Sequence, residues 1–165
     1  MNTTSNSPES LGNNAAAAER LARAIKVAAG EFSLILVCCD SISKRQQILK
    51  FVKELSSVAI QELILSPTDE TLYTTITNNI GLSHPQALMV HGLESVVAIP
   101  QLLISTNLMR DEFRKNLHFP VVLWVNDEVL SQLVWLAPDL KNWAATTIRF
   151  DVNNPKLVEN QVLWA

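Results

Sequence analysis

The segment Phe32–Leu55 constrains the fold most strongly, because it joins a strand pattern, a short turn and a helix pattern. It begins with the apolar run Phe32–Cys39, whose near-continuous hydrophobicity is typical of a parallel strand covered on both faces. The polar turn Asp40–Ser43 follows, and apolar residues then recur at helical spacing over Lys44–Leu55. The segment predicts one strand–turn–helix unit, with Ser43 as the helix N-cap.

The rest of the chain repeats this alternation of strand and helix. Five strands separated by helices predict a single α/β domain over residues 14–165, a three-layer sandwich with a mainly parallel sheet. Residues 1–13 are rich in Asn, Ser and Thr and are expected to form a disordered tail. The further strands are predicted at Ala59–Leu65 (an edge strand, because it alternates), Ala87–His91, Val121–Val125 and Thr147–Val152. Helices are predicted over about 14–29, from Ser66-Pro67 to Ile80, over 100–116, and from Asn126 to Leu136, followed by a short one carrying Trp143.

Charge and composition narrow the class of partner. The 165 residues carry a net charge of −3 with a pI near 5.6, so there is no basic field for a nucleic acid. No apolar stretch approaches the roughly 20 residues of a membrane span. Cys38 and Cys39, adjacent on a buried strand, are expected to be apolar core thiols in a reducing compartment. These features predict a cytoplasmic protein with no nucleic-acid or membrane partner.

The turn after the first strand lies where phosphate-binding loops carry the pattern G-x-x-x-x-G-K-[ST]. Placing Lys44 in the lysine position puts Cys38 and Ser43 at the glycine positions and Arg45 at the hydroxyl position. Side chains would crowd the phosphates there, and the hydroxyl that ligates magnesium is missing. A structural turn with solvated Lys44 and Arg45 is the first interpretation. Weak anion or nucleotide binding by residues 40–45 at the helix N-terminus is the alternative.

The end of the third strand departs from a hydrolytic site in the same way. Nucleotide-hydrolysing proteins with a phosphate-binding loop of this kind carry an Asp-Glu pair there, for magnesium and for activating water. This chain has His91-Gly92 and then Glu94, which either orients a water or is a surface or capping carboxylate. Asn126, at the end of the fourth strand, either contacts a nucleotide or caps the next helix. No catalytic residue, metal or cofactor is therefore expected. ATP with magnesium remains the alternative, with Asp40, Ser43, Lys44, Arg45, Glu94 and Asn126 as its candidate ligands.

Four tryptophans are many for a chain of this length, and one exposed aromatic side chain could anchor a partner. Trp124 lies in a strand and is expected in the core. Trp135, Trp143 and Trp164 are the candidate interaction residues, with core packing as the alternative.

Several motifs resemble the AAA-like, P-loop-derived domain found at the N-terminus of cyanobacterial multidomain repeat proteins. The resemblance spans about residues 15–152 and implies the strand order 5-1-4-3-2. By this resemblance, the 165 residues are expected not to include the helical lid that supplies adenine contacts in such proteins. The matching stretches are "HFPVVLWVNDEVLSQLVWLAPDLKNWAATTIRF" (118–150), with its Leu-Trp strand and Ala-Pro-Asp break, "ALMVHGLES" (87–95) and "LILVCCD" (34–40).

Together these features predict a non-catalytic protein-interaction or regulatory module on a degenerate P-loop NTPase-like fold, working with protein partners. The alternative is a nucleotide-responsive switch that binds ATP or another phosphate ligand with little or no hydrolysis. A receiver-like signalling domain fits less well, because Asp40 and Asp127 are too scattered for a phosphoacceptor site.

Overall fold

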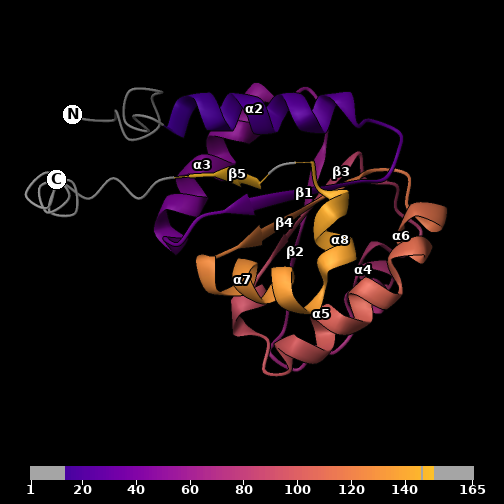
Figure 1. Ribbon diagram of the computed structural model, residues 1–165. Helices are drawn as coiled ribbons and strands as arrows, with labels where there is room; N and C mark the ends of the chain where they lie inside the picture. The colour runs from indigo at the N-terminus through magenta and orange to yellow at the C-terminus, as the bar shows by residue number, and fades with distance from the viewer. Residues whose placement is uncertain (1–13, 146, 151–165) are drawn as a thin grey trace, which may run out of the picture.

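The computed structural model describes residues 14–145 and 147–150 as one layered α/β unit (Figure 1). The predicted tail at residues 1–13 and the segment 151–165, which includes Trp164, lie outside the described residues. No helix in the described part is long and apolar enough to cross a membrane.

Five parallel strands form one sheet in the order β2-β3-β4-β1-β5. This confirms both the predicted fold class and the strand order that the resemblance implied. β2 lies at an edge, as its alternating pattern indicated. The strands are β1 (Ser33–Cys38), β2 (Ile60–Ile64), β3 (Ala87–His91), β4 (Pro120–Val125) and β5 (Thr147–Arg149).

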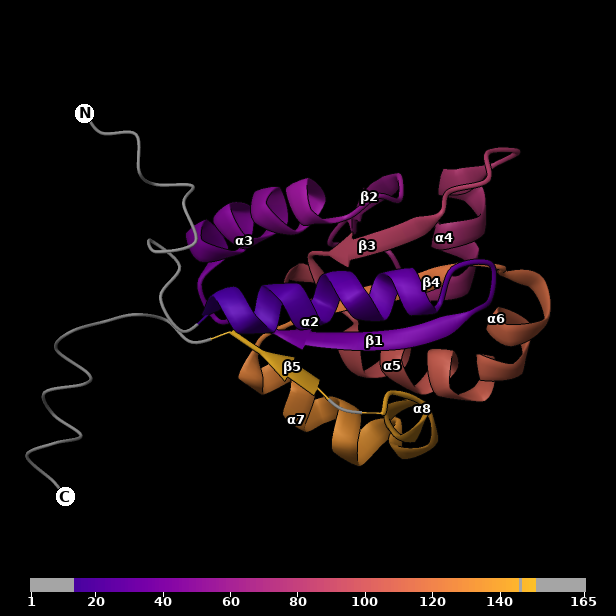
Figure 2. The ribbon, with the colours of Figure 1, turned by 90° about the horizontal axis from the view of Figure 1, so that it is seen from above.

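Helices cover both faces of the sheet, with α2 and α3 on one face and α4 to α8 on the other (Figures 1 and 2). Successive strand residues point to opposite faces, so Leu36 packs under the larger helical layer and Val37 under α2 and α3. The helices are α2 (Asn14–Val27), α3 (Ile42–Leu55), α4 (Leu72–Ile80), the 3-10 turn η2 (Leu93–Ser95), α5 (Ile99–Leu108), α6 (Arg110–Asn116), α7 (Asp127–Leu136) and α8 (Pro138–Trp143).

Two helices begin at other residues than the sequence predicts. α3 begins at Ile42, and Ser41 is its N-cap in place of Ser43, because the Ser41 hydroxyl accepts a hydrogen bond from the Lys44 amide at 3.2 Å. α4 begins at Leu72 and not at Ser66-Pro67. The Asp69 carboxylate instead accepts the Ser66 amide at 2.7 Å, which closes a turn before the helix.

The single helix predicted over residues 100–116 is two helices, α5 and α6. Met109 leaves helical geometry between them, with φ −97° and ψ 12°. The Arg110 guanidinium donates to the Asn107 carbonyl at 2.6 Å, so a side chain binds a backbone oxygen at the end of α5. The Asn107 side chain in turn accepts the Leu140 amide at 2.8 Å, which ties the break to α8.

Candidate functional site

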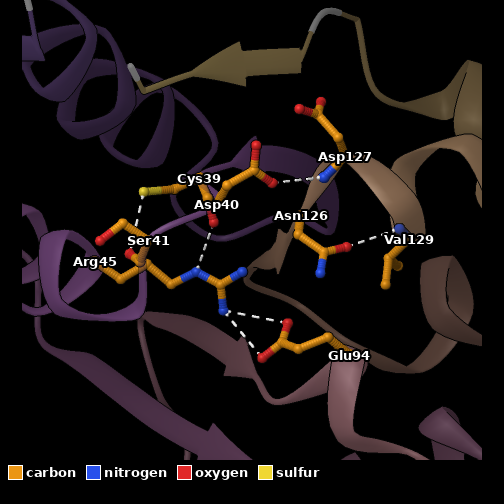
Figure 3. Close-up of polar contacts among 8 residues, drawn as sticks. All are labelled: Cys39, Asp40, Ser41, Arg45, Glu94, Asn126, Asp127 and Val129. Atoms are coloured by element: carbon orange, nitrogen blue, oxygen red, sulfur yellow. Dashed lines mark hydrogen bonds and ion pairs between the residues drawn. The ribbon is translucent and has the colours of Figure 1, made fainter. Parts of the chain in front are cut away.

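The candidate site lies at the edge where the carboxyl ends of the parallel strands meet, since ligands of open α/β sheets bind there. β1 leads into Asp40 and the first turn of α3, β3 leads through Gly92 to Glu94, and β4 leads to Asn126. The structure thus brings Asp40, Arg45, Glu94 and Asn126 to one place, although they are far apart in sequence (Figure 3). Ser43 is exposed and Lys44 half-buried in the same helical turn.

The loop between β1 and α3 is shorter than the phosphate-binding loop of the P-loop pattern. In the P-loop pattern, the residues before the lysine form an extended loop of free backbone N–H groups. Here Cys38 still belongs to β1, and Ile42 already belongs to α3. The Cys39 amide also continues the sheet ladder, donating to the Val125 carbonyl at 2.9 Å. Residues 39–41 alone remain to connect strand and helix.

Arg45 closes the interior of the site. Its side chain is buried, which corrects the expectation that it is solvated, and its Nε donates to the Cys39 carbonyl at 2.9 Å. Its Nη1 lies 3.2 and 3.3 Å from the two Glu94 carboxylate oxygens (Figure 3). The Glu94 side chain is one-fifth exposed, at 21%. A guanidinium therefore lies between α3 and the end of β3, where it is paired with the Glu94 carboxylate.

Two helix N-termini at this edge are capped by the chain's own side chains. Besides the Ser41 cap of α3, the Asn126 side chain accepts the Val129 amide of α7 at 2.8 Å (Figure 3). Asn126 thus has the capping geometry that one of its two sequence interpretations expected. The Asp40 carboxylate accepts the Asp127 amide at 2.8 Å, in the same first turn of α7. The amides that could bind an anion at α7 are thus partly satisfied by side-chain oxygens.

A second polar group, which the sequence analysis did not identify, lies beside Asp40. Arg149 Nη1 is 2.9 Å from an Asp127 oxygen, and Cys38 Sγ is 3.4 Å from the same oxygen. Burial and the Asp127 contact raise the pKa of the Cys38 thiol to about 12, while the Arg149 contact lowers the pKa of Asp127. The register that places β5 next to β1 creates this cluster, and no local sequence pattern signals it.

The ligand atoms of Cys38, Asp40 and Asp127 lie within 4.8 Å of one another, a spacing that a metal ion could use. The chemistry of the group does not favour one. Burial raises the pKa of the Cys38 thiol, so a metal ion that bound there would have to displace the thiol proton. Arg149 already supplies a cation to Asp127. Both cysteines are free and buried, which confirms their assignment as core thiols.

His91 lies at the end of β3 and is buried against Trp124, with ring centroids 5.5 Å apart. Its Nε2 has no hydrogen-bond partner and lies 3.6 Å from a Glu62 oxygen. Burial lowers the pKa of His91 below its usual 6.5, with Arg45 adding to this effect and Glu62 opposing it. His91 is therefore packed in the core, where burial disfavours its charged form.

The tryptophans divide between core and surface. Trp124 is fully buried, as predicted, and its indole N–H points to the Met89 sulfur. Trp143 is half-buried, with the Arg114 guanidinium 4.1 Å from its ring centroid. Trp135 is 81% exposed on α7.

In sequence, no protein-family model and no curated protein matches this chain. Solved structures match it in fold. The ORC2 protein of Aeropyrum pernix, in its ADPNP–ADP complexes, matches with a TM-score of 0.59 at 11% identity, over 92% of this chain and 51% of that one. The ORC1 protein of the same organism, in complex with DNA, matches with a TM-score of 0.55 at 14% identity, over 92% and 50%. The ADP form of ORC2 gives 0.50 at 11% identity, over 89% and 50%.

The fold is AAA-like. The five-stranded parallel sheet has the P-loop NTPase-like order, and the structural neighbours are AAA+ proteins. The likeness shows the fold alone, because identity is so low. The chain spans about half the length of the solved structures it matches.

Proposed function

We propose that this chain is a non-catalytic protein-interaction or regulatory module built on a degenerate P-loop NTPase-like fold. The observation that carries the proposal is the Arg45–Glu94 pair inside the candidate site. Hydrolysis of a nucleotide needs a metal ligand at the start of α3 and a free carboxylate that orients water. Here Arg45, a buried cation, stands at the position of the metal ligand, and the Glu94 carboxylate is paired with it.

The structural neighbours were solved with adenine nucleotides or with DNA. We propose that this AAA-like chain binds neither an adenine nucleotide nor DNA. The three-residue connection between β1 and α3 leaves no loop to wrap phosphates. The net charge of −3 gives no overall attraction to a nucleic-acid backbone. Of the classes of partner considered, we therefore propose proteins.

Titration calorimetry with magnesium-ATP tests the proposal. We expect no saturable heat at millimolar nucleotide, from either the natural chain or a Lys44→Ala variant. Saturable binding that is lost in Lys44→Ala would overturn the proposal and favour the nucleotide-responsive switch. Lys44 suits this comparison because it is half-buried in the first turn of α3, next to the site and outside the Arg45–Glu94 pair.

The outward side of α5 and α7 supports the interaction part of the proposal. Ile104 and Leu108 are exposed on α5, and Val134 and Trp135 are exposed on the adjacent α7. Large apolar side chains on neighbouring helices are typical of a protein contact surface. A partner retained by the natural chain should be lost in Trp135→Ser and kept in Leu82→Ser. Leu82 is an exposed apolar control, at 96%, located outside α5 and α7. Equal retention by both variants would contradict a role for this surface.

A further inference from the structure

The outward side of α5 and α7 carries four large apolar side chains that solvent reaches. Leu108 and Trp135 are mostly exposed, and Ile104 and Val134 are about half exposed. The two helices pack against each other (Figure 1), and the Asn107 side chain ties the end of α5 to the start of α8. The four side chains therefore belong to one helical surface and are not scattered over the molecule.

This surface is free of charge except at one end. α5 contains no Asp, Glu, Lys or Arg, and α7 contains none after its first turn, which holds Asp127 and Glu128. Few charged residues around an aromatic anchor is the composition of the centre of a protein interface. The polar residues that reach solvent beside the four apolar ones are all uncharged: Gln101, Ser105, Asn107, Ser131 and Gln132.

The charge of the whole chain favours a second copy as the occupant of this surface. Each copy carries a net charge of −3, so two copies repel each other wherever their acidic residues meet. Contact through the uncharged part of α5 and α7 avoids this repulsion. The same surface offers no charged group by which to select a different protein. An apolar, uncharged patch is instead self-complementary, as a two-fold interface requires.

The two ends of the surface also have complementary charges. α5 and α7 run in the same direction, because each one follows a strand of the parallel sheet and leads to the next. A two-fold axis perpendicular to them would bring Glu128 towards the end that carries Arg110 of the second copy. Among the residues that the structure describes, Glu128 takes part in no ion pair. Arg110 reaches only the exposed Asp139, at 3.7 Å.

The size of this surface predicts a weak, reversible dimer. α5 and α7 have ten residues each, so each helix is about 15 Å long and about 10 Å wide. Side by side they present about 300 Å² in projection, against roughly 800 Å² of accessible surface per partner in a standard stable interface. We therefore expect a dissociation constant in the micromolar range or weaker.

We propose that a second copy of this chain docks on the outward side of α5 and α7 across a two-fold axis. Leu108 and Trp135 are the central apolar anchors, and Glu128 and Arg110 lie at the rim. The inference rests on the proposed function, because it names the protein partner of the interaction module. It assigns the contact to this one surface of the chain.

Sedimentation velocity of the full chain, from roughly 1 µM to 1 mM, tests the dimer. We expect a reversible monomer–dimer equilibrium. Trp135→Glu and Leu108→Glu each place a carboxylate on the contact surface of both copies, and each should weaken dimerisation at least about tenfold. Leu82→Glu adds the same charge at an exposed leucine outside α5 and α7, and it should dimerise like the natural chain.

NMR spectra of the ¹⁵N-labelled chain locate the contact. Amide shifts that depend on protein concentration should be confined to α5, α7 and the adjoining ends of α6 and α8, and should disappear in Trp135→Glu. Shifts in other elements would overturn the proposal. So would a dimer that Trp135→Glu and Leu108→Glu leave unchanged, or one that Leu82→Glu weakens equally.

A chain that stays monomeric at every concentration would also overturn the second copy as occupant, leaving the surface to a different protein or to another segment of this chain. The magnesium-ATP titration does not depend on the oligomeric state. A monomer that binds no nucleotide would therefore remove this inference and leave the proposed function standing, so the two can fail separately.

Discussion

At the scale of single residues, Arg45 is the side chain on which the proposed lack of nucleotide hydrolysis depends most. Its buried guanidinium contacts both a backbone carbonyl of the strand end and the Glu94 carboxylate. Sequence reasoning placed Arg45 in solvent, because helix periodicity alone does not show what lies opposite. The partner is Glu94, 49 positions away along the chain. The burial of Arg45 is therefore a property of the tertiary fold.

The Arg45–Glu94 pair should respond asymmetrically to mutation. Glu94→Leu leaves a buried guanidinium without its counter-charge, and we expect a loss of about 3 kcal/mol in the free energy of unfolding. Arg45→Met leaves a partly exposed carboxylate that water can reach, and we expect about 1–2 kcal/mol. Urea unfolding of both single variants and the double variant gives the coupling energy. Equal single losses, or strictly additive ones, would contradict this assignment.

His91 makes the free energy of unfolding depend on pH. Its pKa is below 6.5 in the folded chain, mainly because the ring is buried. The nearby carboxylates of Glu62 and Glu94 raise this pKa, and the cationic side chains of Arg45 and Lys53 lower it. Above pH 6.5 the folded and unfolded chains both carry a neutral ring. As pH falls below 6.5, the unfolded chain takes up a proton that the folded chain resists, so stability decreases.

His91→Phe keeps an aromatic ring against Trp124 and removes the titration. The loss of stability between pH 7 and pH 5, measured by urea unfolding, should be smaller in this variant than in the natural chain. His84 and His118 are exposed and present in both proteins, so their contribution is shared. An unchanged pH dependence would show that His91 titrates normally.

At the scale of elements, Gly92 sets the turn that brings Glu94 back to Arg45. It has φ +90°, in the left-handed region, and a Cβ there would lie 3.1 Å from the Leu65 carbonyl oxygen. Gly92→Ala therefore combines backbone strain with a backbone contact that cannot relax easily, and we expect a cost of about 2–3 kcal/mol.

Gly30 is the matched control, because its φ is +85° and an added Cβ would meet no atom within 4 Å beyond its chain neighbours. Gly30→Ala should show the strain alone, about 1 kcal/mol, in thermal or urea unfolding. If Gly30→Ala costs as much as Gly92→Ala, the approach to Leu65 is not the cause.

At the scale of the whole molecule, the sequence predicted the architecture well because burial determines it. Runs such as Leu34–Cys38 are apolar on both faces. This pattern indicates a parallel strand that is covered on both faces, even when the strand order is not known. The exact turns were harder to predict. Sequence pattern predicted Ser43 as the N-cap of α3, whereas Ser41, two residues earlier, caps it. Arg149 reaches Asp127 only because β5 lies beside β1.

We propose that side chains of this chain, Arg45 above all, close the edge where P-loop proteins bind phosphate. The most direct measurement is an NMR titration of the ¹⁵N-labelled chain with magnesium-ATP, followed at the amides of residues 39–45. We expect that these resonances do not move at millimolar nucleotide. Saturable shifts confined to residues 39–45 and the Glu94 region, and absent in Lys44→Ala, would contradict it.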